Sequence, residues 1–207
     1  MKLELIRSTV KEIIERESGK TLFETELTEY VFRAELDFVG TIVALAGGDA
    51  GKLSIIFNEM TETEQETETS GTYAFPSTSV PENIVSIRTS GNVELRRVEP
   101  RMKGRVLGSN DIQLATSTDP VWWVDDLLIN TAPASLGTLD IFFVEIPTQQ
   151  SVANNDITVP DRYVEVIIKY VEYLACTAVN DLPRAKIALN RYFEIIQSVV
   201  GTGEEMK

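Results

Sequence analysis

Apolar side chains recur at helical spacing near both ends of the chain. Near the N-terminus they predict one helix that stops at Gly19 and a longer helix over residues 25–46. Near the C-terminus they predict a helix over residues 160–180, a break at 181–183, and a last helix that ends at Gly201. The two C-terminal helices should form an antiparallel hairpin, because the break between them is short.

The middle of the chain has a different pattern, rich in Thr, Ser, Val and Ile, with turn residues every few positions. It predicts short strands, which cover Leu53–Phe57, Ile84–Thr89, Val93–Val98, Ile112–Ala115, Val121–Val124, Leu127–Ile129 and Thr138–Ile146. Helices occur before and after this block. We therefore predict an α+β fold, in which a helical bundle from residues 1–50 and 151–207 carries an inserted antiparallel β-rich domain over residues 53–148.

The predicted helix over residues 160–180 has an apolar arc wider than half of its circumference. One apolar face suits packing within the bundle. A second apolar flank beside this face then remains without an assigned packing partner. We predict that this flank contacts another subunit. Trp123 joins the candidate interface, because two adjacent tryptophans in a strand point to opposite faces and only one needs to lie in the core. The candidate interface residues are Val164, Ile168, Val171, Ala175 and Trp123.

Composition narrows the chemistry. The chain has 207 residues, no histidine, one cysteine (Cys176) and a formal net charge of −13. Without histidine it lacks the commonest general base and the commonest neutral metal ligand, so we predict no enzymatic activity, no metal and no cofactor. The negative charge excludes a protein whose whole surface binds nucleic acid. The longest apolar stretch, Phe38–Ala46, is too short to span a bilayer, so we predict a soluble protein without a membrane partner.

Two short motifs suggest chemistry at first sight. The stretch Gly47–Lys52 resembles a phosphate-binding loop, but its glycine spacing is one residue short and Leu53 stands where Ser or Thr is needed. We interpret it as a turn. Asp125 and Asp126 are adjacent carboxylates between two predicted strands, and we interpret them as a hairpin turn and not as a metal site.

A run of alternating threonines and glutamates between residues 59 and 69 has no obvious place in a compact domain. In a strand the glutamates would share one face and repel one another. We therefore interpret the run as a solvated, partly disordered loop, or alternatively as a projecting loop or hairpin that presents negative charge to a partner. The glutamates concerned are Glu62, Glu64, Glu66 and Glu68.

From Phe75 onward the order of the motifs is more specific than any one of them. The features that carry this order are Pro120-Val121-Trp122-Trp123, Asp125-Asp126, Pro133, Gly137-Thr138-Leu139, Val159–Tyr163, and Ala185 with Arg191-Tyr192. In these features the chain resembles the head-to-tail adaptor proteins of tailed bacteriophages, and within them the tail tubular protein A group. The strand after Gly137 lacks the tyrosines usual there, and the acidic run has no counterpart.

The resemblance implies a structural protein of the virion neck or tail, assembled in the host cytoplasm. The resemblance also implies that about a dozen identical subunits form a closed ring. They join the portal protein to a tail or nozzle protein, and double-stranded DNA passes through without specific binding. Glu62, Glu64, Glu66 and Glu68 then become candidates for lining the conduit.

The C-terminal tail is expected to be disordered in the free protein and to dock on the portal. This tail covers residues 201–207, and its candidate docking residues are Gly201, Thr202, Gly203, Glu204 and Glu205. Two other functions remain open. One is a different tail-completion or neck component, and the other is a hydrolase that uses carboxylates alone.

Overall fold

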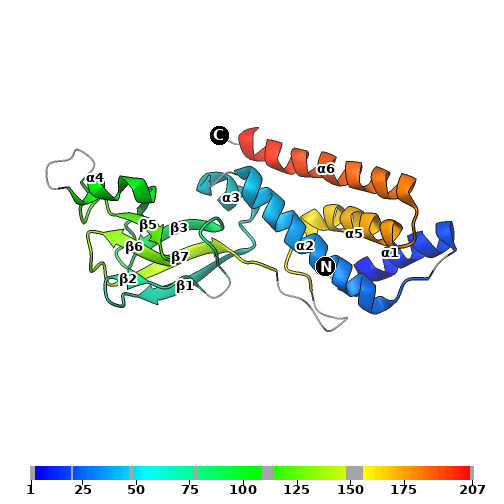
Figure 1. Cartoon of the computed structure of the whole chain (residues 1–207), viewed down its shortest axis with the longest axis horizontal. Coiled ribbons are helices and arrows are strands. Elements are labelled where there is room, and N and C mark those ends of the chain that lie inside the picture. The colour runs from blue at the N-terminus through cyan, green and yellow to red at the C-terminus, as the bar shows by residue number, and fades with distance from the viewer. Residues whose placement is uncertain are drawn as a thin grey trace. The chain divides into compact units, whose positions relative to one another are not determined.

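The computed structural model describes residues 3–19, 21–46, 49–76, 79–108, 114–147 and 156–205. The chain forms two compact units (Figure 1). The helical unit comprises Met1–Gly47, Ile55–Met60 and Ile146–Lys207, and the β unit comprises Gly48–Ser54 and Thr61–Glu145. The predicted α+β class is confirmed, with N- and C-terminal helices and mostly antiparallel sheets between them.

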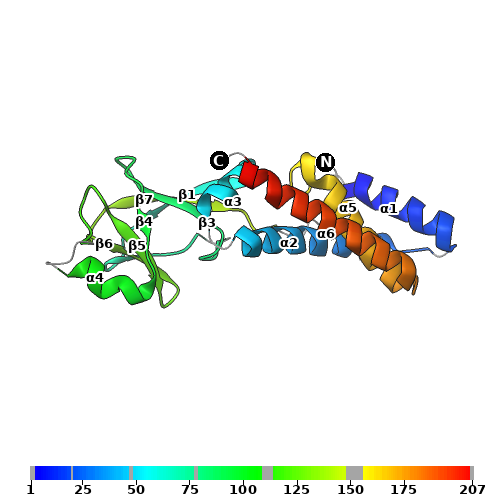
Figure 2. The same cartoon turned by 90° about the horizontal axis from the view of Figure 1, so that it is seen from above.

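The helical unit is built around one central helix. Helix α5 (Val164–Ala178) follows the short 3₁₀ helix η2 (Asp161–Tyr163) and contacts α1 (Leu3–Ser18), α2 (Glu24–Ala46) and α6 (Leu182–Glu205) (Figures 1 and 2). Its wide apolar arc is therefore covered by three helices of its own chain.

The covering of α5 changes the candidate interface. Val171 and Ala175 are fully buried inside the helical unit. They have no surface left for a neighbouring subunit, and this part of the predicted interface is corrected. Val164 and Ile168 remain partly exposed.

The ends of the helices follow from local residues. Gly19 adopts a positive φ of 65° after α1, a conformation that a glycine adopts without strain. Asn180 does the same after α5 with a φ of 63°. There the Asp181 amide donates to the Cys176 carbonyl at 2.8 Å, which closes the helix end. The Asp181 carboxylate then accepts the Arg184 amide at 3.4 Å and caps α6, so the predicted helical hairpin is confirmed.

The last helix is longer than predicted. Helix α6 does not end at Gly201 but continues to Glu205, so the prediction of a disordered tail over residues 201–207 is wrong for residues 201–205, and residues 206 and 207 lie outside the described residues. A glycine costs about 1 kcal/mol in a helix interior, yet it keeps its amide donor and does not force the chain to stop.

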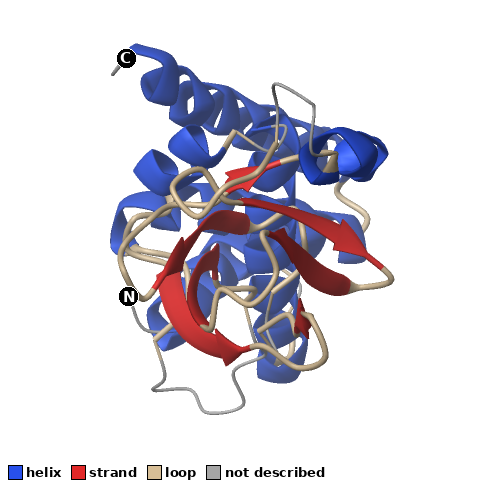
Figure 3. Cartoon of the chain, turned by 90° about the vertical axis from the view of Figure 1, so that its left-hand side faces the viewer, coloured by secondary structure: helices blue, strands red, loops and turns tan. Residues whose placement is uncertain are grey.

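The β unit contains two sheets. One has the order β1 (Thr61–Thr67), β7 (Thr138–Val144), β3 (Ile84–Thr89), and both of its pairings are antiparallel. The other has the order β2 (Thr72–Tyr73), β6 (Leu128–Ala132), β5 (Val121–Asp125), β4 (Arg96–Arg97), with β4 parallel to β5. Figure 3 shows the strands in red. Side chains from both sheets share one core: Tyr73, Ile84, Ile87, Leu95, Trp122, Ile129, Leu139, Ile141 and Phe143.

Both tryptophans are buried. Trp122 and Trp123 point to opposite faces of β5, as the alternation predicts, and Trp122 belongs to the shared core. Trp123 packs in a second cluster with Val106, a residue of the short helix α4 (Lys103–Leu107) that follows the 3₁₀ turn η1 (Pro100–Met102). Only 3% of the Trp123 side chain is exposed, so its assignment to a subunit interface is corrected.

Several predicted strands shift or disappear. The segment predicted as strand Leu53–Phe57 belongs to helix α3 (Ala50–Ile56), because the Asp49 carboxylate caps it by accepting the Lys52 amide at 3.1 Å. A short apolar run alone does not distinguish strand from helix. The strand predicted over Val93–Val98 is reduced to Arg96–Arg97.

Two further predictions concern the segments around β5. A hairpin turn between β5 and β6 is confirmed, but it lies one residue later than predicted. Asp125 is the last residue of β5, and the central residues are Asp126 and Leu127, both at positive φ. In the predicted strand Ile112–Ala115, residues 112 and 113 lie outside the described residues.

Candidate interaction surfaces

The acidic run is a paired strand and not a loop. All of β1, from Thr61 to Thr67, is in antiparallel register with β7. Glu62 stands opposite Phe143, and Glu64 stands opposite Ile141, so the glutamates lie on the core-facing side of the sheet. They avoid burial because β1 is the outermost strand, where water screens their mutual repulsion. The interpretation of this run as a solvated loop is therefore wrong.

The glutamates of β1 nevertheless influence one another. Partial burial raises the pKa of Glu66, and the negative charge of Glu64 raises it further. Partial burial also raises the pKa of Glu145, with a further contribution from Glu62. Among the described residues, Glu62, Glu64 and Glu66 form no ion pair, and we call these three residues the acidic edge.

Positive charge gathers in another part of the β unit. Residues 53–87 and 106–161 contain no lysine or arginine. The segment between them contains Arg88, Arg96, Arg97, Arg101, Lys103 and Arg105. The positive side chains of the β unit are therefore concentrated in one segment of the chain, where several of them form ion pairs with Glu94, Glu99, Asp119 and Asp125.

The basic segment borders a cavity of about 370 Å³ beside β3 and β4. The chain changes sheets at this point: the Leu95 amide donates to Ile87 of β3 at 2.8 Å, and the Arg96 amide donates to Pro120 at 2.9 Å. We call this cavity the basic slot. It is lined by Ile84, Val85, Ser86, Glu94, Leu95, Arg96, Arg97 and Trp122.

The two arginines of the basic slot are both exposed, and they differ in their partners. Arg96 forms an exposed ion pair with Asp119 at 3.3 Å. The Arg97 guanidinium lies 5.1 Å from the centre of the Trp122 ring. In the described part of the chain, Arg97 has no carboxylate partner.

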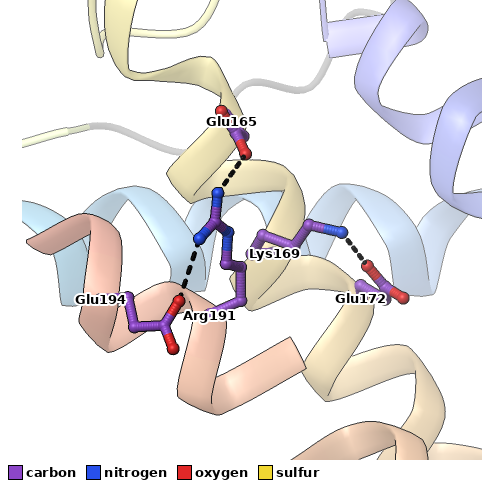
Figure 4. A network of polar contacts seen from close by, with 5 residues as sticks. All are labelled: Glu165, Lys169, Glu172, Arg191 and Glu194. Atoms are coloured by element: carbon purple, nitrogen blue, oxygen red, sulfur yellow. Dashed lines mark hydrogen bonds and ion pairs between the residues drawn. The ribbon is translucent and has the colours of Figure 1, made fainter. Parts of the chain in front are cut away.

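The helical unit carries a network of ion pairs between α5 and α6 (Figure 4). Glu172 is buried, and its carboxylate contacts Lys169 at 2.8 Å and Arg184 at 3.5 Å. On the exposed side, Arg191 lies between Glu165 at 4.0 Å and Glu194 at 2.9 Å. These charges neutralise one another, so the network stabilises the hairpin and leaves no charged group aimed at a ligand.

A second polar cluster joins three helices. The Asp37 carboxylate on α2 accepts hydrogen bonds from the Tyr170 hydroxyl at 3.1 Å and from the Tyr192 hydroxyl at 2.5 Å. Burial raises the pKa of Tyr170 to about 12, and the negative charge of Asp37 contributes. Burial and the same carboxylate also raise the pKa of Tyr192. Both hydroxyls therefore stay protonated near neutral pH and act as donors within the bundle.

Other groups with potential chemistry are structural. Cys176 is fully buried in α5. Among the described residues, no three His, Cys, Asp or Glu side chains are grouped closely enough to hold a metal ion. No helix in the described part of the chain has the length and apolar character needed to cross a membrane.

Three large apolar residues of α6 are exposed: Leu182 at its start, and Ile187 and Phe193 within it. Phe193 is 48% exposed, although Tyr192 beside it is fully buried. Ile187, which the pattern did not single out, is 69% exposed. Both lie on the sides of a helix whose buried stripe is narrow, so the apolar pattern by itself did not reveal them.

Comparison with known proteins identifies the family. A protein-family model described as SU10 adaptor protein matches residues 3–205. The match includes the N-terminal helices, which the motifs from Phe75 onward did not reach. The resemblance to phage head-to-tail adaptors is confirmed, but the comparison with tail tubular protein A is not. No curated protein matches the chain significantly. The chain therefore belongs to the SU10 adaptor family, and it is a structural adaptor protein of a bacteriophage virion.

Proposed function

We propose that the protein forms a closed ring of identical subunits that joins the portal to the tail and lines the path of the DNA. The supporting observation is the family match over residues 3–205. A ring also suits the formal net charge of −13, because a negatively charged lumen repels phosphate and lets DNA slide. On this proposal the protein has no catalytic role.

The portal contact is proposed at the end of α6. Residues Gly201–Glu205 continue this helix, so a portal protein would receive a helix end and not an extended tail. Truncation after Val200 should weaken portal binding and leave the circular dichroism spectrum nearly unchanged. Equal binding by the truncated and full chains would overturn this contact.

The helical unit also supplies candidates for contacts between subunits. Val164 and Ile168 are partly exposed on α5, and Ile187 and Phe193 are exposed on α6. In an Ile168→Asp variant, loss of assembly with a folded monomer would support an interface at α5. Unfolding of the monomer would show that Ile168 is core, and normal assembly would exclude it from the interface.

The ring itself is tested by mass and by imaging. Mass photometry and electron microscopy of the pure chain, alone and mixed with the portal protein of the same phage, should show closed rings or a collar on the portal. A chain that stays monomeric and does not bind the portal would overturn the proposal. Binding to tail proteins alone would favour another tail-completion component. Turnover of a glycan, abolished by one carboxylate substitution, would favour a hydrolase.

A further inference from the structure

The two outer strands of the β1-β7-β3 sheet differ in charge. At one side, β1 carries the acidic edge, and no other strand in the described part of the chain pairs with the outer side of β1. At the other side, β3 borders the basic slot with its exposed Arg96 and Arg97. One β unit therefore presents a negative strand at one edge of this sheet and, beyond its other edge, a slot between β3 and β4 whose two exposed arginines belong to β4 of the second sheet.

The basic slot has the features of a site for carboxylate side chains. Its wall includes the apolar side chains of Ile84, Leu95 and Trp122. Its charged lining residues are the two arginines and Glu94, and the Glu94 carboxylate lies 3.6 Å from Arg88. Arg97 is held over the Trp122 ring, which limits its conformations before any partner arrives. A guanidinium binds carboxylates by paired hydrogen bonds, and a partly apolar surrounding strengthens such contacts.

The acidic edge has the complementary features. Its glutamates repel one another and have no positive partner among the described residues. A nearby guanidinium would relieve this repulsion. Glutamates on the core-facing side of an edge strand also oppose the addition of another strand, so a contact through side chains is favoured over a continuous sheet.

We propose that the acidic edge of one subunit docks against the basic slot of the next copy of the same chain. The complementary charges lie on two different edges of one unit, so the contact is heterologous and can close a ring. This inference rests on the proposed self-association and adds to it the surface that sets the order of neighbours. It also competes with the expectation that the same glutamates face the DNA.

Charge reversal tests the contact in the full-length chain. The first variant is Arg96→Glu/Arg97→Glu, and the second is Glu62→Lys/Glu64→Lys. Each variant alone presents like charges at both edges, and its self-association should weaken by about tenfold or more at low salt. An equal mixture of the two variants restores opposite charges at every contact, so the mixture should associate like the wild type.

Matched controls separate this contact from a general effect of net charge. Lys11→Glu/Arg16→Glu and Glu4→Lys/Glu12→Lys make the same net changes on α1, away from the candidate contact residues of α5 and α6, and should associate like the wild type. Far-ultraviolet circular dichroism verifies that each variant is folded. High salt should weaken the self-association of the wild type toward that of the edge variants, because the Debye length falls and the opposite charges are screened from one another.

The outcomes distinguish this contact from the ring. If the wild type associates and both edge variants do so equally well, the contact is refuted and the proposed ring stands. If only the arginine variant loses binding to double-stranded DNA, with association unchanged, the slot serves nucleic acid and the contact is refuted. If the glutamate variant assembles normally but alters DNA ejection, the acidic edge faces the conduit instead. A wild type that never associates, alone or on the portal, overturns both proposals.

Discussion

Glu35 provides the sharpest test of how the helical unit is held together. This residue of α2 is 1% exposed, and one of its carboxylate oxygens accepts two backbone amides, from Thr158 at 2.6 Å and from Val159 at 3.1 Å. These amides belong to the segment that leads into η2 and α5. We predict that Glu35→Ala strongly destabilises the helical unit, because both amides lose their acceptor in a buried place.

The size of the effect follows from these two bonds. An unsatisfied buried donor costs about 1–3 kcal/mol, so the alanine variant should lose about 3 kcal/mol of unfolding free energy. For a chain of this length, the midpoint of thermal unfolding should fall by roughly 6–12 °C. Glu35→Gln is the matched control, because its amide oxygen can accept the same two bonds. It should lose only about 1 kcal/mol, since a neutral acceptor forms weaker bonds.

Two spectroscopic signals assign the effect to one unit. Trp122 and Trp123 are the only tryptophans and both lie in the β unit, so tryptophan fluorescence reports its unfolding. Far-ultraviolet circular dichroism is dominated by the helices. The alanine variant should lower the dichroism midpoint more than the fluorescence midpoint, and amide exchange at Thr158 should speed up. Equal stability of the alanine and glutamine variants would refute the reasoning.

Three further predictions concern the helical unit. The pKa of Tyr170 is raised to about 12 from 10.0. As the pH rises, the unfolded chain therefore loses the Tyr170 proton at a lower pH than the folded chain does. Stability present below pH 10 should therefore fall as the pH rises toward about 12, and Tyr170→Phe should flatten that fall in denaturant titrations. Glu172→Gln should cost about 2 kcal/mol in such titrations, because it weakens a buried ion pair, whereas Glu194→Gln at an exposed pair should cost under about 0.5 kcal/mol. Asn180 lies at positive φ, which alanine adopts only with strain and glycine adopts freely. Asn180→Ala should therefore lower the unfolding free energy by about 1 kcal/mol, and Asn180→Gly should not. Equal unfolding free energies of the two variants would contradict the role of this helix end.

The sequence predicted those elements whose boundaries depend on neighbouring residues. Gly19, Asn180 and Asp181 stop or start helices through contacts within a few positions, and a reader of the sequence can recognise them. The apolar run at α3 was assigned to the wrong element because its length and composition suit both helix and strand, and the Asp49 cap decides between them.

Burial by distant segments could not be predicted from local patterns. The wide apolar arc of α5 indicated more than one packing partner, which is correct, but α1, α2 and α6 of the same chain are the partners that cover Val171 and Ala175. Trp123 poses the same problem, since α4 covers it from another part of the chain. A pattern shows how much of a surface is apolar, and only the tertiary fold shows which segment covers it.

The acidic run shows how strand position decides whether repulsion is tolerated. In a central strand, glutamates on the core-facing side would lose water on both flanks, and their repulsion would exclude that structure. At an edge, β1 gains its full register with β7 while Glu62 and Glu64 stay in water. The remaining repulsion makes this edge a poor template for strand addition but a good surface for a positive partner. The basic slot beyond the other edge of this sheet is the positive surface that the chain itself supplies, and an equal mixture of the two charge-reversed variants tests whether it is used.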